Sequence, residues 1–284
     1  IHNDLIKGRT EVKNVAEYTP MMQQYLKTKE EYKDCILFYR LGDFYEMFFD
    51  DAIVVSKELE LTLTGKSCGT EERAPMCGVP YHAVEGYLNK LVANGHKVAI
   101  CEQVEDPKLA KGLVKREVIR IVTPGTNTDM QALDESKNNY IMCIVYLADK
   151  YGISLADIST GDYFVTEVDS ERKLIDEINK FAPSEIICNE SFYMSGVDLS
   201  DMKHRLGIAV YSLESWYFSD ETAENTLKEH FKVQSLEGLG LSDYACGTIA
   251  AGALLRYLYE TQKNDLGNLS SIHPYSTGKY MIID

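Results

Sequence analysis

An aromatic ring and a carboxylate two residues apart are the side chains of this sequence best suited to act on another molecule. They are Phe44 and Glu46, in the stretch LGDFYEMFFD, which follows a short apolar run. A ring that stands clear of its domain can wedge between base steps of DNA, at a cost of roughly a few kcal/mol that is least where a base is mispaired. The neighbouring carboxylate can hydrogen bond to the edge of a displaced base and repels intact duplex. The alternative is that Phe44 packs beneath a helix with Phe48.

A second candidate is the tripeptide Gly65-Lys66-Ser67, which matches the tail of a nucleotide-binding phosphate loop. That loop needs another glycine where this chain has Glu60, so that successive backbone N–H groups can wrap a phosphate. A carboxylate at this position repels phosphate. We therefore interpret residues 66–73 as an exposed polar loop.

Catalytic and metal-ligating residues do not stand at recognisable spacings, so we expect neither kind of site. His82 has no nucleophile and acid placed to work with it and is best explained as a surface histidine near a helix start. The seven cysteines lie in apolar segments without a CxxC pair, which is typical of reduced core residues in a cytosolic protein. No apolar run reaches the roughly 18 residues that a membrane-spanning helix needs, so we expect no membrane partner.

Positive charge is concentrated in the first half of the chain. The formal net charge is −15, but residues 1–130 carry 17 Lys and Arg against 20 Asp and Glu, whereas residues 131–284 carry 12 against 24. A polyanion would have to meet the first half. The most basic window contains five cations, either a solvated face or an edge that follows phosphates: Lys108, Lys111, Lys115, Arg116 and Arg120.

The elements that position Phe44 and Glu46 follow from hydrophobic periodicity and from Pro and Gly. We predict a helix over residues 19–34, a buried strand over 35–42 and a helix from Glu46 or Met47 to residue 61, with Phe48 in its core register and Tyr45 turned inward. A strand at 61–65, a helix from Pro80 to Gly95 and strands at 97–104 and 117–125 complete one mixed α/β domain.

A second domain follows a polar stretch. Three strand-like runs at 140–149, 151–159 and 161–168, joined by very short turns, indicate an antiparallel meander. Helices and strands then alternate, ending with a helix over 242–263 whose Gly247 and Gly252 permit close packing. This order is that of a ribonuclease H-like α/β fold. Metal-dependent nuclease activity is then an alternative function, but the first strand has no acid before Asp149, and the acids near the second turn, Asp157 and Asp162, are of a common exposed kind.

Several long blocks of the first half occur in one order that resembles a known family. They are TPMMQQY (19–25), FYRLGDFYEMFFDDA (38–52), PMCGVPYHAVEGYL (75–88), VAICEQVEDP (98–107) and VIRIVTPGT (118–126). Together they closely resemble the amino-terminal mismatch-recognition domain of the bacterial DNA mismatch repair MutS family. Weaker motifs such as LADISTGDYFVTEV extend the resemblance through the rest of the chain.

The resemblance implies a mixed-sheet α/β mismatch-recognition domain followed by a ribonuclease H-like connector domain. The implied boundaries are a leader or appended segment at 1–17, the recognition domain at 18–125, a linker at 126–139, the connector at 140–263 and the start of a lever and core domain at 264–284. The ATPase domain and the dimerisation elements of the family have no counterpart in this sequence.

The resemblance also assigns residue roles. The family's Phe-x-Glu motif, in which the phenylalanine inserts at the mismatch and the glutamate bonds the mispaired base, falls on Phe44 and Glu46. Residues near 64–67 and 76–82 are implied to line the minor groove, among them Lys66, Ser67, Met76, Pro80, Tyr81 and His82, with Lys66 as the first choice for a phosphate contact. The basic window adds Lys108 and Lys111 as candidate contacts to the DNA. Gly65 stands where family members often have a second basic residue, and Glu71 and Glu72 follow, so this loop departs from the family pattern.

The implied partners are mismatched double-stranded DNA, a second subunit of the same protein, and MutL, which docks on the connector domain. The chain itself is expected to need no cofactor and to catalyse nothing, whereas the full-length protein would use ATP and magnesium in the bacterial cytoplasm, associated with the nucleoid. A further alternative is a paralogue that acts on recombination intermediates. Such paralogues lack the Phe-x-Glu motif, so Phe44 and Glu46 discriminate between the two.

Overall fold

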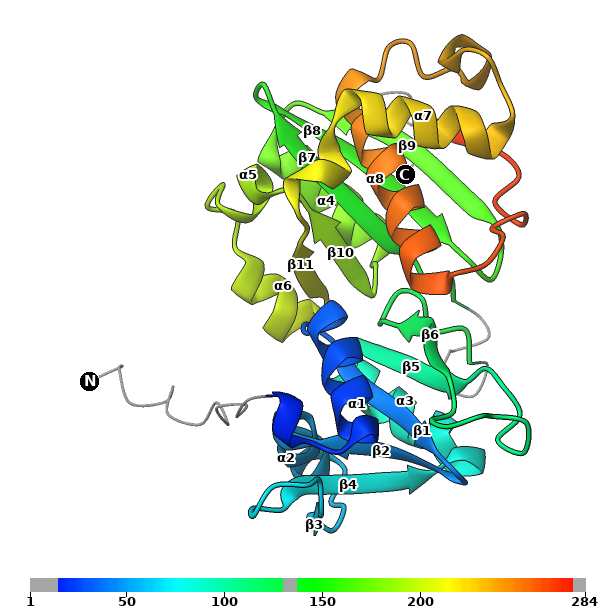
Figure 1. The fold of residues 1–284 in the computed structure, drawn as a ribbon. Coiled ribbons are helices and arrows are strands. Elements are labelled where there is room, and N and C mark those ends of the chain that lie inside the picture. Colours follow the sequence, from blue (N-terminus) through cyan, green and yellow to red (C-terminus); the bar gives the residue numbers. More distant parts are fainter. Residues whose placement is uncertain (1–14, 130–136, 278–284) are drawn as a thin grey trace. The chain divides into compact units, whose positions relative to one another are not determined.

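The computed structural model describes residues 15–129 and 137–277, which divide into two units, one ending at Thr123 and the other beginning at Pro124 (Figure 1). Most of the predicted leader, the middle of the predicted linker and the last seven residues lie outside the described part. Each unit has its own six-stranded sheet.

The first unit is built on a mixed sheet with strand order β3-β4-β2-β1-β5-β6. Only β1 and β5 pair in parallel, and the other neighbours are antiparallel. The strands are β1 (Ile36–Leu41), β2 (Phe44–Phe48), β3 (Thr64–Lys66), β4 (Ala74–Pro80), β5 (Val98–Gln103) and β6 (Arg116–Val122).

Helices cover both faces of this sheet. On one face α1 (Pro20–Glu31), capped by the Thr19 hydroxyl, buries Met22 and Tyr25 against Tyr39 and Phe48. On the other face α2 (Phe49–Glu58) and α3 (Val84–Ala93) pack over a core that includes Tyr45, Met47, Val55 and Leu88. Successive strand residues point to opposite faces, so β2 contributes alternately to the two layers.

Two predictions for this unit are wrong. The helix expected from Glu46 or Met47 begins at Phe49, because residues 44–48 form a strand that pairs with both β1 and β4. Phe48 is buried as predicted, but it lies in the α1 layer, whereas Val55 lies in the α2 and α3 layer, so the two share no helical face. Strand β4 was not predicted, because Pro75, Gly78 and Pro80 are residues that usually interrupt strands.

The loop after β3 is less exposed than expected. Cys68 is buried, and its carbonyl accepts a hydrogen bond of 2.7 Å from the Thr19 amide at the start of α1. All seven cysteines are buried free thiols, as predicted.

The second unit has strand order β11-β10-β7-β8-β9-β12. β7 (Ile141–Leu147), β8 (Lys150–Asp157) and β9 (Asp162–Val168) form the predicted antiparallel meander, and β10 (Glu185–Cys188) and β11 (Ala209–Ser212) continue parallel to β7 on its other side. This is the ribonuclease H-like arrangement. The short β12 (His273–Pro274) extends the sheet beside β9.

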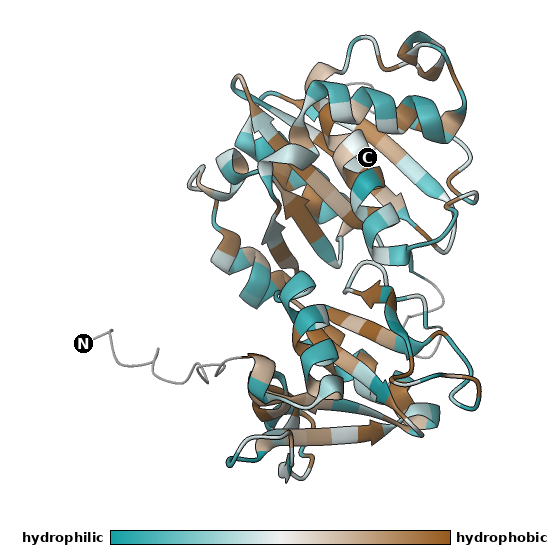
Figure 2. Ribbon diagram, viewed as in Figure 1, coloured by the Kyte–Doolittle hydropathy of each residue, from teal (hydrophilic) through white to brown (hydrophobic). Residues whose placement is uncertain are grey.

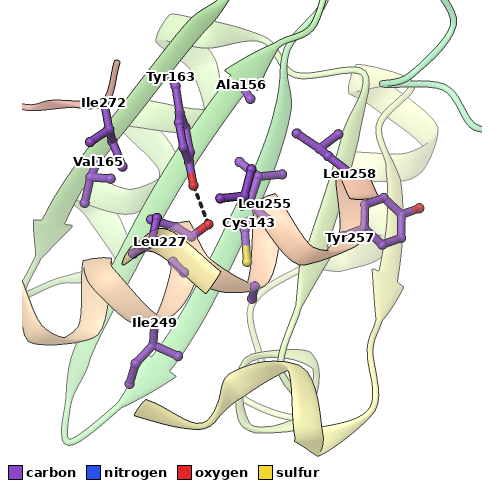
Figure 3. Close-up of a cluster of buried hydrophobic side chains, with 14 of the residues drawn as sticks. Cys143, Ala156, Tyr163, Val165, Leu227, Ile249, Leu255, Tyr257, Leu258 and Ile272 are labelled. Carbon is purple, nitrogen blue, oxygen red and sulfur yellow. Dashed lines mark hydrogen bonds between the residues drawn. The ribbon is translucent and has the colours of Figure 1, made fainter. Parts of the chain in front are cut away.

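Helices again form a layer on each face. α4 (Glu171–Phe181), α5 (Glu190–Tyr193) and α6 (Leu199–Leu206) cover one face, while α8 (Ala245–Gln262), with α7 (Asp220–Phe231) against it, covers the other. Figure 2 shows β7 and β10 as largely hydrophobic and much of α7 as hydrophilic. Tyr163 points from β9 to α8, where its hydroxyl donates a hydrogen bond of 2.5 Å to the Ala251 carbonyl (Figure 3).

Two residues at the boundaries of the predicted linker, Gly125 just before it and Asn139 at its end, make hydrogen bonds within the second unit. The Gly125 amide donates to the buried Glu185 carboxylate over 2.8 Å, and the Asn139 side-chain amide donates to the Pro124 carbonyl over 3.1 Å. None of the helices in the described residues is long and apolar enough to cross a membrane.

Candidate nucleic-acid interface

Phe44 and Glu46 lie on the face of the first sheet that α1 covers only in part. They begin β2 directly after a turn in which Gly42 has φ +59°, a left-handed conformation that glycine adopts without strain. Tyr45, between them, is buried on the opposite face, as predicted. On their own face α1 buries Phe48 beneath Tyr25, but Phe44 keeps 46% of its surface exposed. The ring is therefore not packed beneath a helix.

A glycine on the neighbouring strand keeps the surface between these two side chains open. Phe44 pairs with Pro80 and Glu46 pairs with Gly78 across the β2–β4 ladder. A Cβ atom at Gly78 would stand 3.6 Å from Glu46 Cγ, 3.8 Å from Phe44 Cδ1 and 3.2 Å from the Tyr45 carbonyl oxygen. Any larger residue at Gly78 would fill the space beside both side chains.

The carboxylate of Glu46 is engaged by Lys66. The Lys66 ammonium lies 2.5 Å from Glu46 Oε2, and the two side chains are 31% and 17% exposed. The same ammonium stands 5.7 Å from the centre of the Phe48 ring. The lysine expected to touch phosphate is therefore paired with the glutamate of the motif.

The other predicted contacts on β3 and β4 surround this pair. Met76 and Pro80 are half-buried, and their β4 positions pair with Phe48 and Phe44. Ser67 is exposed and follows Lys66 at the end of β3. Lys66 itself pairs with Ala74 in a β-ladder rather than preceding a helix, so this tripeptide does not have phosphate-loop geometry.

Tyr81 and His82 are exposed and lie beyond the end of β4, in a short 3₁₀ turn. The Tyr81 amide donates to the Asp43 carbonyl over 3.0 Å, which ties this turn to the β1–β2 turn. The His82 ring stands edge-on to the Tyr81 ring, with centroids 5.9 Å apart. Both residues therefore directly follow Pro80, the strand partner of Phe44.

Arg40, which sequence reasoning missed, braces the β1–β2 turn. Its guanidinium lies 3.9 Å from the centre of the Tyr81 ring, its Nε donates to the Gly42 carbonyl over 2.5 Å, and its Nη1 lies 3.3 Å from Glu102 Oε1. The sequence feature that could have identified Arg40 is its position two residues before the turn glycine Gly42. The geometry suits a role in orienting the turn.

The same Glu102 carboxylate accepts a hydrogen bond from the Tyr45 hydroxyl. Burial, together with this neighbouring carboxylate, raises the pKa of Tyr45 above its ordinary value, so the hydroxyl stays protonated and donating. This bond fixes the inward residue between Phe44 and Glu46, so the two outward side chains keep their direction.

Three cations of the basic window, Lys108, Lys111 and Lys115, lie in the loop between β5 and β6, while Arg116 and Arg120 lie on β6. β5 runs parallel to β1, so its carboxyl end and this loop lie at the same end of the sheet as the β1–β2 turn. Lys115 pairs with Glu117 over 2.5 Å and Arg116 donates to the Arg40 carbonyl over 2.8 Å, whereas Lys108 and Lys111 are exposed and make no ion pair among the described residues. These two cations remain free to meet phosphate.

The second unit has no comparable constellation of chemical groups in its described residues, where no group of three or more His, Cys, Asp or Glu is placed to hold a metal ion. Asp157 and Asp162 are both bonded by the Asn138 side-chain amide, over 3.0 Å each. Asp157 also accepts from the Asn139 amide over 3.0 Å, and Asp162 from the Tyr140 hydroxyl over 3.1 Å. These acids organise the loops beside the sheet.

Comparison with known proteins gives matches over both units. Residues 19–131 match the family model MutS domain I, and residues 139–270 match MutS domain II.

Three relatives carry the name DNA mismatch repair protein MutS. The one from Lachnoclostridium phytofermentans is 66% identical over 270 residues, covering 95% of this chain and 29% of the relative. Those from Acetivibrio thermocellus and Ruminiclostridium cellulolyticum are 52% and 51% identical, covering 95% and 94% of this chain and 31% and 30% of the relatives. The chain thus spans about three-tenths of the length of these relatives.

Proposed function

The chain belongs to the MutS family, of which it carries domains I and II, and from this premise we propose that it recognises mismatched double-stranded DNA in mismatch repair. The observation that carries the proposal is the half-exposed Phe44 ring beside Glu46 on an open sheet face. The name of these relatives, DNA mismatch repair protein MutS, agrees with this role.

In the proposed mechanism Phe44 enters the minor groove at the mispaired step and kinks the duplex. Unstacking costs on the order of a few kcal/mol per step and is cheapest at a mismatch, so the wedge itself discriminates against paired DNA. Glu46 hydrogen bonds to the edge of the displaced base, whereas intact duplex offers its carboxylate no such bond. The cost of deformation and the missing hydrogen bond therefore both favour the mismatch.

The residues around Phe44 and Glu46 would contact the walls of the minor groove and the DNA backbone. Lys66, Ser67, Met76 and Pro80 lie on or beside the same sheet face, and Tyr81 and His82 border it. Lys108 and Lys111 would follow the phosphate backbone from the adjoining loop. Their contribution depends on salt, whereas the wedge supplies specificity for the defect.

For the second unit we propose the role of a connector that passes the mismatch signal to an ATPase domain of the full-length protein and offers a docking surface to MutL. Pairing with a second subunit, dependence on ATP and magnesium, and a place in the bacterial cytoplasm at the nucleoid belong to the same proposal. The chain itself catalyses no step in this account. Its acidic composition, 24 Asp and Glu against 12 Lys and Arg in residues 131–284, suits protein rather than DNA contacts.

The two alternative functions are not favoured. A nuclease of the ribonuclease H type needs clustered carboxylates free to bind metal, and Asp157 and Asp162 are occupied by loop contacts. A paralogue specialised for recombination intermediates lacks the Phe-x-Glu motif that this chain has at Phe44 and Glu46. Incubation of labelled duplex with the protein and either magnesium or manganese tests the first alternative, and we expect no cleavage.

The proposed function is tested by titrating the full-length protein against two duplexes at several salt concentrations. The two duplexes have the same sequence except that one contains a single mispair and the other is fully paired. We expect tighter binding to the mispaired duplex. Equal affinity for the two duplexes at every salt concentration would refute the proposal. The isolated chain should bind both duplexes weakly, and nanomolar affinity at physiological salt would contradict that expectation.

A further inference from the structure

The ion pair between Lys66 and Glu46 joins a residue suited to phosphate and a residue suited to a base edge. The two charged atoms are 2.5 Å apart, and the side chains of Lys66 and Glu46 are only 31% and 17% exposed. Solvent therefore screens this ion pair less than one at an open surface. While it is closed, the sheet face beside Phe44 presents neither a free cation nor a free carboxylate from this pair. Arg73, the other cation of the β3–β4 hairpin, is turned to the Gly65 carbonyl instead.

On paired duplex, opening this ion pair is unfavourable. Lys66 would gain a phosphate, but Glu46 would be left half-buried and unpaired beneath a polyanion, without a base edge to bond. At a mismatch the displaced base offers Glu46 a hydrogen bond that replaces the ammonium. Lys66 can then leave Glu46 without leaving the carboxylate unpaired.

We propose that Lys66 is a specificity-determining residue that exchanges Glu46 for a DNA phosphate only when Glu46 engages a mispaired base. This inference rests on the proposed function and adds to it a release step for one cation. The mismatch signal is thereby converted into an additional phosphate contact.

The position of Lys66 suits such an exchange. It is the last residue of β3, which is the outermost strand of its sheet, and exposed Ser67 follows it. A lysine has a flexible four-carbon stem, so its ammonium can swing from Glu46 to a phosphate without breaking a ladder hydrogen bond. Glu46 lies on the inner strand β2 and keeps its backbone pairing with Gly78 throughout.

Salt dependence distinguishes this exchange from a simple phosphate contact. Each phosphate neutralised by a cation steepens the slope of log affinity against log salt by about 0.9, which corresponds to roughly a three- to fourfold loss between 50 and 200 mM salt. For the unaltered full-length protein we expect the slope to be steeper by about that amount on mispaired duplex than on paired duplex. Lys66→Met should abolish this difference in slope, because the additional phosphate contact on mispaired duplex is lost.

Glu46→Gln should release Lys66 on both duplexes, so binding to paired DNA strengthens and its slope steepens by about 0.9. In the double variant Lys66→Met with Glu46→Gln this gain should disappear, so the two substitutions are not additive.

Lys66→Arg, which keeps the charge, should retain the difference in slope between the duplexes. Lys57→Met on α2, an exposed lysine on the other face, is the matched control and should leave that difference unchanged. Urea unfolding of each variant checks that the fold is intact.

Three results would overturn the exchange while leaving mismatch recognition in place. They are equal slopes on the two duplexes for an unaltered protein that still prefers the mismatch, a difference in slope that persists in Lys66→Met, and additive effects on the slope in the double variant. Equal affinity of the unaltered protein for both duplexes would instead refute the proposed function together with the exchange.

Discussion

Glu46 and Gly78 lie directly opposite each other on β2 and β4, and the missing side chain of Gly78 leaves open the surface between Glu46 and Phe44. This relationship ties the two proposed contact residues to a third position, which has no side chain of its own. It makes the proposed wedge sensitive to the size of the residue at position 78.

Gly78→Ala should weaken mismatch discrimination by roughly three- to tenfold with only a small loss of stability, about 1 kcal/mol. The new Cβ would lie 3.2 Å from the Tyr45 carbonyl oxygen and close to both outward side chains, so β2 must shift slightly. Competition binding with mispaired and paired duplexes measures the effect. Gly86→Ala, in α3 with open space around it, is the control and should leave discrimination intact. Undiminished discrimination in Gly78→Ala would contradict this view of the surface.

Arg40→Met should reduce discrimination although Arg40 is not proposed to touch a base. It removes the stacking on Tyr81 and the bonds to Gly42 and Glu102 that brace the β1–β2 turn. We expect an unfolding free energy lower by about 1–2 kcal/mol.

Arg40→Lys keeps the charge but not the planar fork, and it should behave more like the Met variant than like the unaltered protein. Arg172→Met, an exposed charge removal in the second unit, controls for net charge. If Arg40→Lys restored discrimination fully, charge rather than orientation would be the cause.

Part of the interface could be predicted from local sequence. Phe44 and Glu46 were expected to face outward and Tyr45 inward because they precede the helical register of Phe48. The structure has this orientation, but it arises from the alternation of side chains along strand β2. The helix start could not be predicted from spacing, because Phe48 fits the helical period of Val55 but is held in a strand by two neighbouring strands.

Contacts between distant segments were beyond sequence reasoning. The Lys66–Glu46 ion pair depends on β3 and β2 being joined through β4, and β4 was hidden by its two prolines and its glycine. The bracing by Arg40 depends likewise on the turn after β4 meeting the turn after β1. In both cases long-range pairing, rather than composition, decides what the side chain does.

Asp51 is predicted to be a major stabilising residue of the first unit. Its buried carboxylate accepts a hydrogen bond of 2.9 Å from the Leu37 amide and one of 3.0 Å from the Lys29 ammonium. Asp51→Ala leaves both donors without this acceptor and should lower the unfolding free energy by about 2–3 kcal/mol in urea titrations. A loss below about 0.5 kcal/mol would show that the pair contributes little.

The contribution of Asp51 to folding stability depends on pH and increases as the pH falls. Burial raises the pKa of Asp51 above its ordinary value of 3.8, although Lys29 and the Leu37 amide act in the opposite direction. The folded state therefore binds this proton more tightly than the unfolded state, and the contribution of Asp51 to stability grows as pH falls through its folded pKa toward 3.8. The stability deficit of Asp51→Asn should widen between pH 7 and about pH 4, and a deficit that narrows would contradict the assignment.

Gly252 should be essential to the packing of α8 on α7. A Cβ at this position would lie 2.4 Å from Ala223 Cα, so Gly252→Ala must push the helices apart. We expect a loss of more than about 2 kcal/mol despite the better helix propensity of alanine. Gly238→Ala, which has open space, is the control in thermal unfolding. A stabilised Gly252→Ala variant would contradict the close helix contact.

The most direct test of the central claim is the ratio of affinities for mispaired and paired duplex in full-length Phe44→Ala. The ring is exposed, so its removal should cost little stability, and the ratio should fall close to one because the wedge is lost. Leu63→Ala, an equally exposed apolar residue outside the strands, serves as control and should keep the preference. An unchanged preference for the mismatch in Phe44→Ala would contradict the account.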